Sequence, residues 1–139
     1  MRAFLLMSNS FRFIKFNNTF HMKLGHIEIF VKNPLESKKF YTDLLGFEVV
    51  DVQDNKFVWL KSGDSLILLR PGDYSPDSVT SEYSKSKSGL VIYTDDLERT
   101  SGKLKSKGLE FKGTDGSDKC LTFIDPDGNW LQLVNPEDH

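Results

Sequence analysis

The sequence predicts an α+β fold built from two copies of one unit, in which a strand and a helix are followed by three more strands (βαβββ). One observation is the strand pattern of residues 24–31, which leads directly into a capped helix start. Another is that the same order begins again sixty-two residues after His26, at Ser88. A third is that Gly46 and Gly108 end the two predicted helices at this same spacing, since a glycine readily adopts the positive φ of a helix end. We therefore predict a pseudo-symmetric pair of units.

The first strand alternates apolar and polar residues in the manner of a half-buried strand. Ile29 and Val31 are expected to pack against a helix. His26 and Glu28 then lie on the opposite face, toward either solvent or a cavity.

The first helix and the three strands after it follow from local signals. Asn33 is a good N-cap, and Pro34 suits the first helical position because its missing N–H would be unpaired there. Three alternating stretches separated by turn residues come after the helix, and we expect strands at residues 47–52, 56–61 and 65–70.

The second unit repeats this order after a stretch rich in Ser and Pro, which we interpret as a linker. Asp95 is expected to cap the second helix, with Glu98 three residues on. Asp115 and Gly116 are typical of a hairpin turn. The strands of the second unit are expected at residues 90–93, 109–112, 120–124 and 130–134.

The whole repeat fits one domain, preceded by an extension rich in phenylalanine. Met22 stands immediately before the first patterned strand, so that translation starting there is an alternative. The expected boundaries are 1–22 for the extension, 23–139 for the domain, about 24–71 for the first unit, 72–87 for the linker and about 88–136 for the second unit.

The amino-acid composition limits the classes of molecule that this protein is expected to bind. Lys and Arg (18) nearly balance Asp and Glu (20), so no strong field favours nucleic acid or an anionic membrane. No apolar run approaches the roughly 20 residues that span a bilayer. Cys120 is the single cysteine, which excludes an intrachain disulfide and suits a reducing compartment. We expect a cytoplasmic protein whose partner is a small organic molecule, or another protein, and neither a nucleic acid nor a membrane.

The duplicated order, together with two short motifs, resembles the vicinal oxygen chelate superfamily, which includes glyoxalases, bleomycin resistance proteins and extradiol dioxygenases. The motifs are the Asp-Pro-Asp-Gly-Asn turn at residues 125–129 and the helix-to-strand passage at residues 41–47. The resemblance covers about residues 24–136 and implies that the two units form a cupped mixed sheet. It also implies a homodimer.

The resemblance further implies where a metal would bind, because metal enzymes of this superfamily place ligands on the first and last strand of each unit. Read through the internal repeat, these positions are His26, Ile67, Ser88 and Gln132. His26 and Gln132 have plausible donor atoms, whereas Ile67 has none. A catalytic divalent metal generally takes three protein ligands. The expected metal set is thus incomplete: no cofactor is expected, and a divalent metal is left open.

The same reading predicts the residues of a ligand-binding cavity between the two units. No catalytic group can be named. The expected wall residues are His26, Glu28, Trp59, Ile67, Ser88, Leu90, Trp130 and Gln132.

Three functions remain open at this point. The first is a binder of a small organic ligand, resembling bleomycin resistance proteins, without a complete metal site. The second is a metal-dependent lyase, epimerase or dioxygenase of the same superfamily with an atypical ligand set. The third is a protein-interaction domain whose cup is filled by side chains. Whether the protein is an enzyme is therefore undecided from the sequence.

Overall fold

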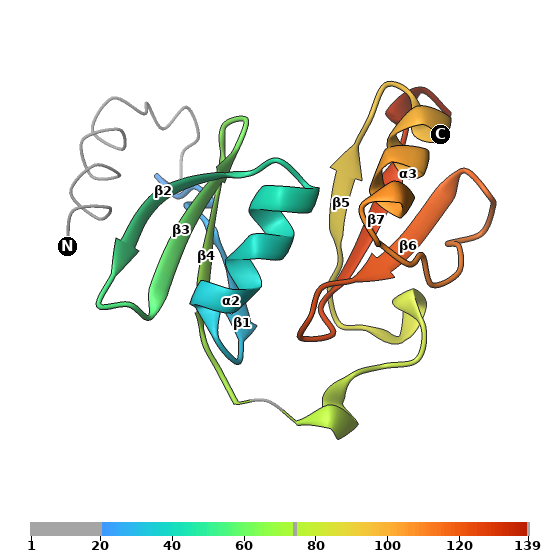
Figure 1. The fold of residues 1–139 in the computed structure, drawn as a ribbon. Coiled ribbons are helices and arrows are strands. Elements are labelled where there is room, and N and C mark those ends of the chain that lie inside the picture. The colour runs from blue at the N-terminus through green and yellow to red at the C-terminus, as the bar shows by residue number, and fades with distance from the viewer. Residues whose placement is uncertain (1–20, 74, 139) are drawn as a thin grey trace. The chain divides into compact units, whose positions relative to one another are not determined.

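Two units follow each other along the chain, each with its own sheet and helix (Figure 1). The structure is a computed structural model and describes residues 21–73 and 75–138. The first unit ends at Asp73. Nearly all of the predicted extension, residues 1–20, lies outside the described residues.

The first unit has the predicted βαβββ order. Its helix continues into a π-helical turn at Phe40–Leu44. In the sheet, strands lie in the order β1-β4-β3-β2, with β1 parallel to β4 and the other neighbours antiparallel. The elements are β1 (Ile27–Val31), α2 (Pro34–Lys39), β2 (Glu48–Gln53), β3 (Phe57–Ser62) and β4 (Ser65–Pro71).

The predicted signals at both ends of the first helix are confirmed. The Asn33 side chain accepts hydrogen bonds from the backbone N–H groups of Leu35 and Glu36, at 3.1 and 3.4 Å. Pro34 occupies the start of the helix. Gly46 has φ of 75°, a conformation that disfavours residues with a side chain. The helix therefore begins and ends where the sequence indicates.

The two faces of the first sheet differ in character. The face toward α2 is apolar, and Val58, Leu60 and Leu69 are fully buried there. Because neighbouring residues of a strand point to opposite faces, Trp59 and Leu68 lie on the other face. We call this second face the open face of the first sheet.

The second unit has a three-stranded sheet in the order β5-β7-β6, with β5 parallel and β6 antiparallel to β7. Short 3-10 turns occur at Pro76–Ser78, Tyr83–Lys85 and Pro136–Asp138. The elements are β5 (Leu90–Tyr93), α3 (Leu97–Ser106), β6 (Cys120–Ile124) and β7 (Trp130–Val134).

The prediction of a strand at residues 109–112 is wrong: no strand is assigned to this stretch. Its backbone bonds to β6 near its end, where the Lys112 N–H donates to the Thr122 carbonyl at 2.7 Å, and just beyond it Thr114 forms an isolated bridge with Leu121. Gly113, with φ of 88°, turns the chain between these two contacts. The alternation of residues 109–112 was therefore sufficient for a local contact but not for a fourth strand.

The helix cap of the second unit is also corrected. Asp96, and not Asp95, is the N-cap of α3, and its carboxylate accepts from the Arg99 N–H at 3.0 Å. Glu98 is then two residues beyond the cap, still in the first turn, where a negative charge is favourable. Two adjacent aspartates offered two possible caps, and only the backbone geometry distinguishes them.

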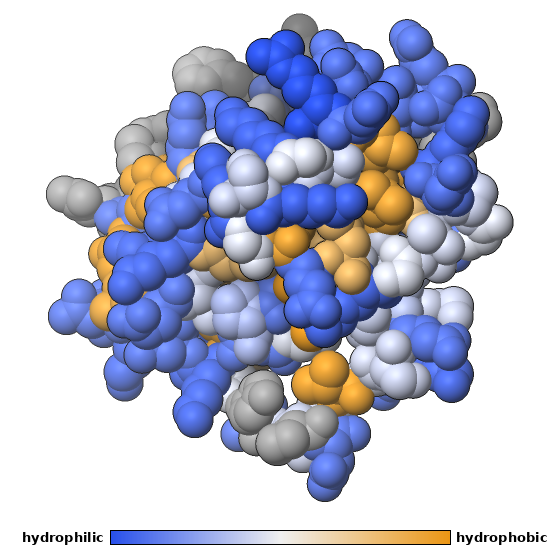
Figure 2. Space-filling view, turned by 45° about the vertical axis from the view of Figure 1, so that its right-hand side comes forward, coloured by the Kyte–Doolittle hydropathy of each residue, from blue (hydrophilic) through white to orange (hydrophobic). Residues whose placement is uncertain are grey.

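The face of the molecule seen in Figure 2 is mostly hydrophilic, with hydrophobic side chains in small separate patches. Over residues 21–73 and 75–138, none of the helices combines the length and the apolar character needed to cross a bilayer.

Candidate ligand-binding site

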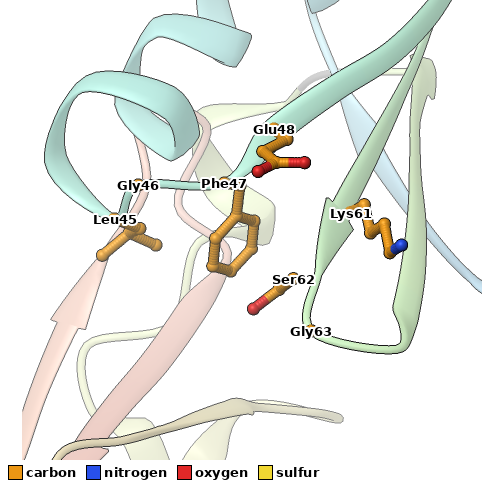
Figure 3. A pocket seen from close by; sticks show the side chains of 7 residues that line it. All are labelled: Leu45, Gly46, Phe47, Glu48, Lys61, Ser62 and Gly63. Atoms are coloured by element: carbon orange, nitrogen blue, oxygen red, sulfur yellow. The ribbon is translucent and has the colours of Figure 1, made fainter.

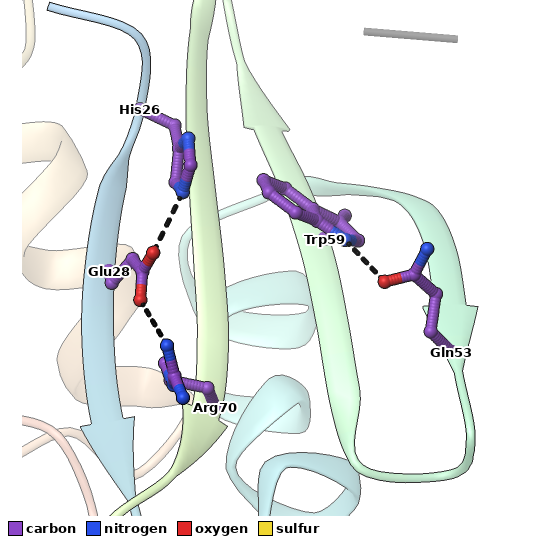
Figure 4. A network of polar contacts seen from close by, with 5 residues as sticks. All are labelled: His26, Glu28, Gln53, Trp59 and Arg70. Carbon is purple, nitrogen blue, oxygen red and sulfur yellow. Dashed lines mark hydrogen bonds and ion pairs between the residues drawn. The ribbon is translucent and has the colours of Figure 1, made fainter. Parts of the chain in front are cut away.

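A chain of three polar side chains lies on the open face of the first sheet (Figure 4). Arg70 donates from Nη1 to Oε1 of Glu28 at 2.7 Å, and Nε2 of His26 lies 3.1 Å from Oε2 of the same carboxylate. The hydrogen bond from Arg70, followed by that from His26, holds the pKa of Glu28 below its ordinary value of 4.5. Glu28 is therefore an anion at neutral pH, shared between two basic side chains.

The register of β1 and β4 explains why these three residues meet. Glu28 pairs with Leu68, and Phe30 pairs with Arg70, so all four side chains belong to one face. Arg70 is forty-two residues from Glu28 in sequence, and only the parallel pairing of β1 with β4 brings them together. Sequence reasoning missed Arg70, because the periodicity of each strand says nothing about which residue of another strand lies beside it.

Trp59 connects the three polar side chains to a buried apolar cluster on the same face. Its indole packs edge-on against the His26 ring, with 4.8 Å between the ring centres and 67° between the planes. Its Nε1 donates to Oε1 of Gln53 at 3.2 Å. Trp59 and Leu68 form an apolar cluster, against which Phe57 also packs. The three polar side chains thus lie beside a buried apolar cluster that supports them.

Arg70 lies near two aromatic rings, and one of its donors has no partner in the described part of the chain. Its guanidinium carbon lies 5.4 Å from the centre of the Phe30 ring and 5.9 Å from that of Phe57. These rings restrain the planar group, as expected for cation–π contacts. Its Nε is buried and has no hydrogen-bond partner in the described part of the chain. Of the donors of this side chain, Nη1 is thus engaged with Glu28 while Nε is not.

The expectation that Ile67 shares a face with His26 is wrong. Ile67 pairs with Ile27 and Leu60, on the face that packs against α2. Leu68 takes the place assigned to Ile67, beside Glu28 on the open face. The repeat position assigned to Ile67 belongs to Leu68, which pairs with Glu28 as Gln132 pairs with Val91.

In the second sheet, too, predicted site residues lie on different faces. Leu90 pairs with Leu131 whereas Val91 pairs with Gln132, so Leu90 lies on the opposite face from Gln132. This corrects the expectation that the two share a wall. Ser88 precedes β5, and its carbonyl accepts a hydrogen bond from Ser86. In the second unit, then, neither of these two residues lies beside Gln132.

Trp130 and Gln132 do share a face of the second sheet, because they are two residues apart in β7. Gln132 is 5% exposed, and its Nε2 donates to Oδ2 of Asp115 at 3.0 Å. The Trp130 Nε1 donates to the Thr80 carbonyl at 3.3 Å. Both side chains are therefore already engaged within their own unit.

Comparison with known proteins identifies the family. The family model described as Glyoxalase/Bleomycin resistance protein/Dioxygenase superfamily matches residues 23–133. The chain belongs to this superfamily. The resemblance inferred from the duplicated order and the Asp-Pro-Asp-Gly-Asn turn is thus confirmed, as is the α+β fold class.

Relatives of this superfamily member differ in length. A lactoylglutathione lyase from Schizosaccharomyces pombe is 28% identical over 81% of the chain and 47% of the relative. The uncharacterized protein YetH from Bacillus subtilis is 25% identical over 80% of the chain and 96% of the relative. The chain thus spans about half the length of the yeast enzyme it matches.

Solved structures show the same fold. A lactoylglutathione lyase from Agrobacterium tumefaciens has a TM-score of 0.63 at 14% identity, covering 84% of this chain and 96% of that one. The fosfomycin resistance protein FosX from Listeria monocytogenes, solved with Mn(II), has a TM-score of 0.63 at 18% identity, covering 81% and 89%. The antibiotic-binding protein TnmS3 from Streptomyces has a TM-score of 0.60 at 24% identity, covering 84% and 99%.

Metal-bound relatives raise the question of whether these side chains fit a metal ion. His26 and Glu28 are two suitable donors side by side, but Leu68 and Trp59 beside them have no ligating group. Among the described residues, no three His, Cys, Asp or Glu side chains are placed to hold an ion. The described residues around His26 in the first unit thus supply two ligands, whereas a catalytic metal generally takes three protein ligands.

A shallow hollow of about 280 Å³ lies elsewhere in the first unit (Figure 3). It lies between the Phe47 ring and the turn from β3 to β4, and none of the predicted site residues lines it. It offers no metal-ligating cluster and no large apolar wall. Its lining residues are Leu45, Gly46, Phe47, Glu48, Lys61, Ser62 and Gly63.

Proposed function

We propose that this superfamily member binds a small organic ligand on the open face of the first sheet, without needing a metal ion. The observation that carries the proposal is the accessible ion pair of Arg70 and Glu28 beside the exposed ring of Phe30. Ligand sites typically pair a mostly apolar wall with a few placed polar groups. The cavity between the two units, expected from the resemblance, stays a prediction.

The side chains of this face indicate the chemistry of the ligand. A flat, apolar part would pack against the exposed Phe30 ring and the half-buried Phe57, and an anionic or acceptor group would accept from the guanidinium of Arg70, whose side chain is 40% exposed. A planar guanidinium suits carboxylates and similar anions, because its donors are fixed in a fork. A ring-bearing carboxylic acid fits both requirements.

A thermal-shift screen of ring-bearing acids, run with and without a chelator, tests the proposal. A ligand present at about 100 times its Kd stabilises the folded state by about 2.7 kcal/mol, which a melting curve detects readily. Binding that is unaffected by the chelator is expected for the wild type. Arg70→Met should abolish the shift.

A matched control comes from Lys39, a basic residue of the same unit that pairs with Glu36 at 3.2 Å on the exposed side of α2. Lys39→Met removes a positive charge in the same way as Arg70→Met but leaves the open face intact. The same ligand shift in Lys39→Met and in Arg70→Met would contradict the proposed site.

A second candidate is the metal-dependent enzyme, which is favoured by the adjacent donors His26 and Glu28 and by a relative that is a lyase. It requires a third ligand beyond these two. A chelator that abolishes both ligand binding and a stoichiometric metal content would support this candidate instead.

Homodimerisation and a cytoplasmic location, both expected above, remain proposals. Two-fold dimers are the commonest assemblies of soluble chains. Light scattering after gel filtration should give twice the chain mass of 15.9 kDa for a dimer, and the chain mass itself would contradict it.

A further inference from the structure

The open face of the second sheet, the one that carries Trp130 and Gln132, is covered by the chain's own segment 79–83, which we call the strap. The Trp130 indole donates to the Thr80 carbonyl at 3.3 Å. The Tyr83 ring meets the Trp130 ring edge-on, with 6.3 Å between the centres and 86° between the planes. Residues of the expected linker thus pack on the sheet of their own unit.

The Tyr83 ring enters a niche that exists because residue 89 is a glycine. A Cβ added to Gly89 would lie 2.6 Å from Cζ of Tyr83, far closer than such atoms approach. Gly89 lies on the same face of the sheet as Gln132, because Val91 pairs with Gln132 and Gly89 is two residues before Val91. The niche is therefore formed by the backbone just before β5 and by side chains of the neighbouring strand β7.

The far end of the niche is polar. The Tyr83 hydroxyl interacts with Gln132, which is itself held by Asp115 at 3.0 Å. Burial, together with the nearby Asp115 carboxylate, raises the pKa of Tyr83 above its ordinary value of 10.0. The phenol thus stays neutral at physiological pH and can act as both donor and acceptor.

The same position in the first unit carries a side chain of its own. Seven residues before the N-caps Asn33 and Asp96 stand His26 and Gly89, respectively. The first unit therefore presents an imidazole where the second has no side chain, and Tyr83 fills the space left there.

We propose that the second unit contains a phenol-binding niche, formed by Gly89, Trp130 and Gln132, that the chain's own Tyr83 occupies. Its external ligands are para-substituted phenols, which reproduce the Tyr83 side chain and enter when the strap lifts. This site is separate from the open face of the first sheet, and its test does not depend on that proposal.

The test uses p-cresol, which is the tyrosine side chain as a free molecule, on the full chain carrying Tyr83→Ala. We expect the variant to melt roughly 5 °C or more below the wild type. p-Cresol should restore much of this loss, and toluene should restore less, because toluene cannot bond to Gln132. Tyr83→Ala/Gly89→Ala should bind p-cresol about tenfold more weakly, since the added methyl enters the niche.

The two tryptophans provide an internal control by NMR. The indole N–H signal of Trp130 should move on addition of p-cresol, whereas that of Trp59, whose N–H donates to Gln53 in the other unit, should stay. The wild type at high p-cresol should show the same selectivity with a smaller movement, because its strap competes. Absence of a Trp130 response in both proteins, or equal responses of both indoles, would overturn the proposal.

Discussion

Replacing Gly89 by alanine is the sharpest test of how the second unit is packed. The added Cβ would lie 2.6 and 2.7 Å from Cζ and Cε1 of Tyr83, so the ring must either move by several tenths of an ångström or leave. Moving it strains the packed site, and releasing it gives up its contacts with Trp130 and Gln132. Overpacking of this kind costs about 1–3 kcal/mol, which we expect as the loss in free energy of unfolding.

Gly102 supplies a control of opposite sign in the same unit. It lies inside α3, and an added Cβ there meets nothing within 4 Å. Gly102→Ala should stabilise by about 1 kcal/mol, because alanine favours the helix by that amount. Denaturant unfolding followed by tryptophan fluorescence measures both changes.

Combining Gly89→Ala with Tyr83→Ala tests whether the clash with the Tyr83 ring causes the loss of stability in Gly89→Ala. In a Tyr83→Ala background, Gly89→Ala meets an empty niche and should cost less than about 0.5 kcal/mol. A cost that is the same with and without Tyr83, or a Gly89→Ala protein as stable as the wild type, would refute the reasoning.

Three further predictions concern single groups. Glu28 is stabilised as an anion, so its contribution to stability is present above its unfolded pKa and is lost as the pH falls through its lowered folded pKa. The difference in free energy of unfolding between the wild type and Glu28→Gln, measured with urea, should therefore shrink as the pH is lowered. Tyr83 has a raised pKa, so the stabilisation of its neutral form is present below pH 10 and is lost as the pH rises through the pKa of the folded state. Tyr83→Phe should therefore lose less stability than the wild type as the pH rises through that range. Leu69 is fully buried under α2, and Leu69→Ala should cost about 2–5 kcal/mol in the same unfolding experiment; a loss below 1 kcal/mol would contradict this packing.

Much of the fold could be predicted because its signals are local. Asn33 and Pro34 mark a helix start through the chemistry of their own side chains, and Gly46 marks its end through φ. The strands 90–93, 120–124 and 130–134 coincide with β5, β6 and β7 because their apolar runs are bounded by turns. The family followed from the order of these elements.

The site could be predicted only in part, because it depends on pairing between distant strands. The face of His26 and Glu28 followed from alternation within β1, but which residue of β4 lies beside them depends on register. The repeat predicted Ile67 at the position that Leu68 occupies, one residue further along β4, and it did not indicate Arg70. The place of Tyr83 could not be predicted for a related reason, since nothing in an irregular segment indicates which sheet it covers.

The metal content of the protein, purified without chelator and measured by mass spectrometry, tests the central claim most directly. The claim is that the His26 and Glu28 face binds an organic ligand without a resident metal, because the residues beside them have no ligating group. The account predicts far less than one Zn, Ni, Mn or Fe per chain in the wild type. A stoichiometric metal that disappears in His26→Ala would contradict it.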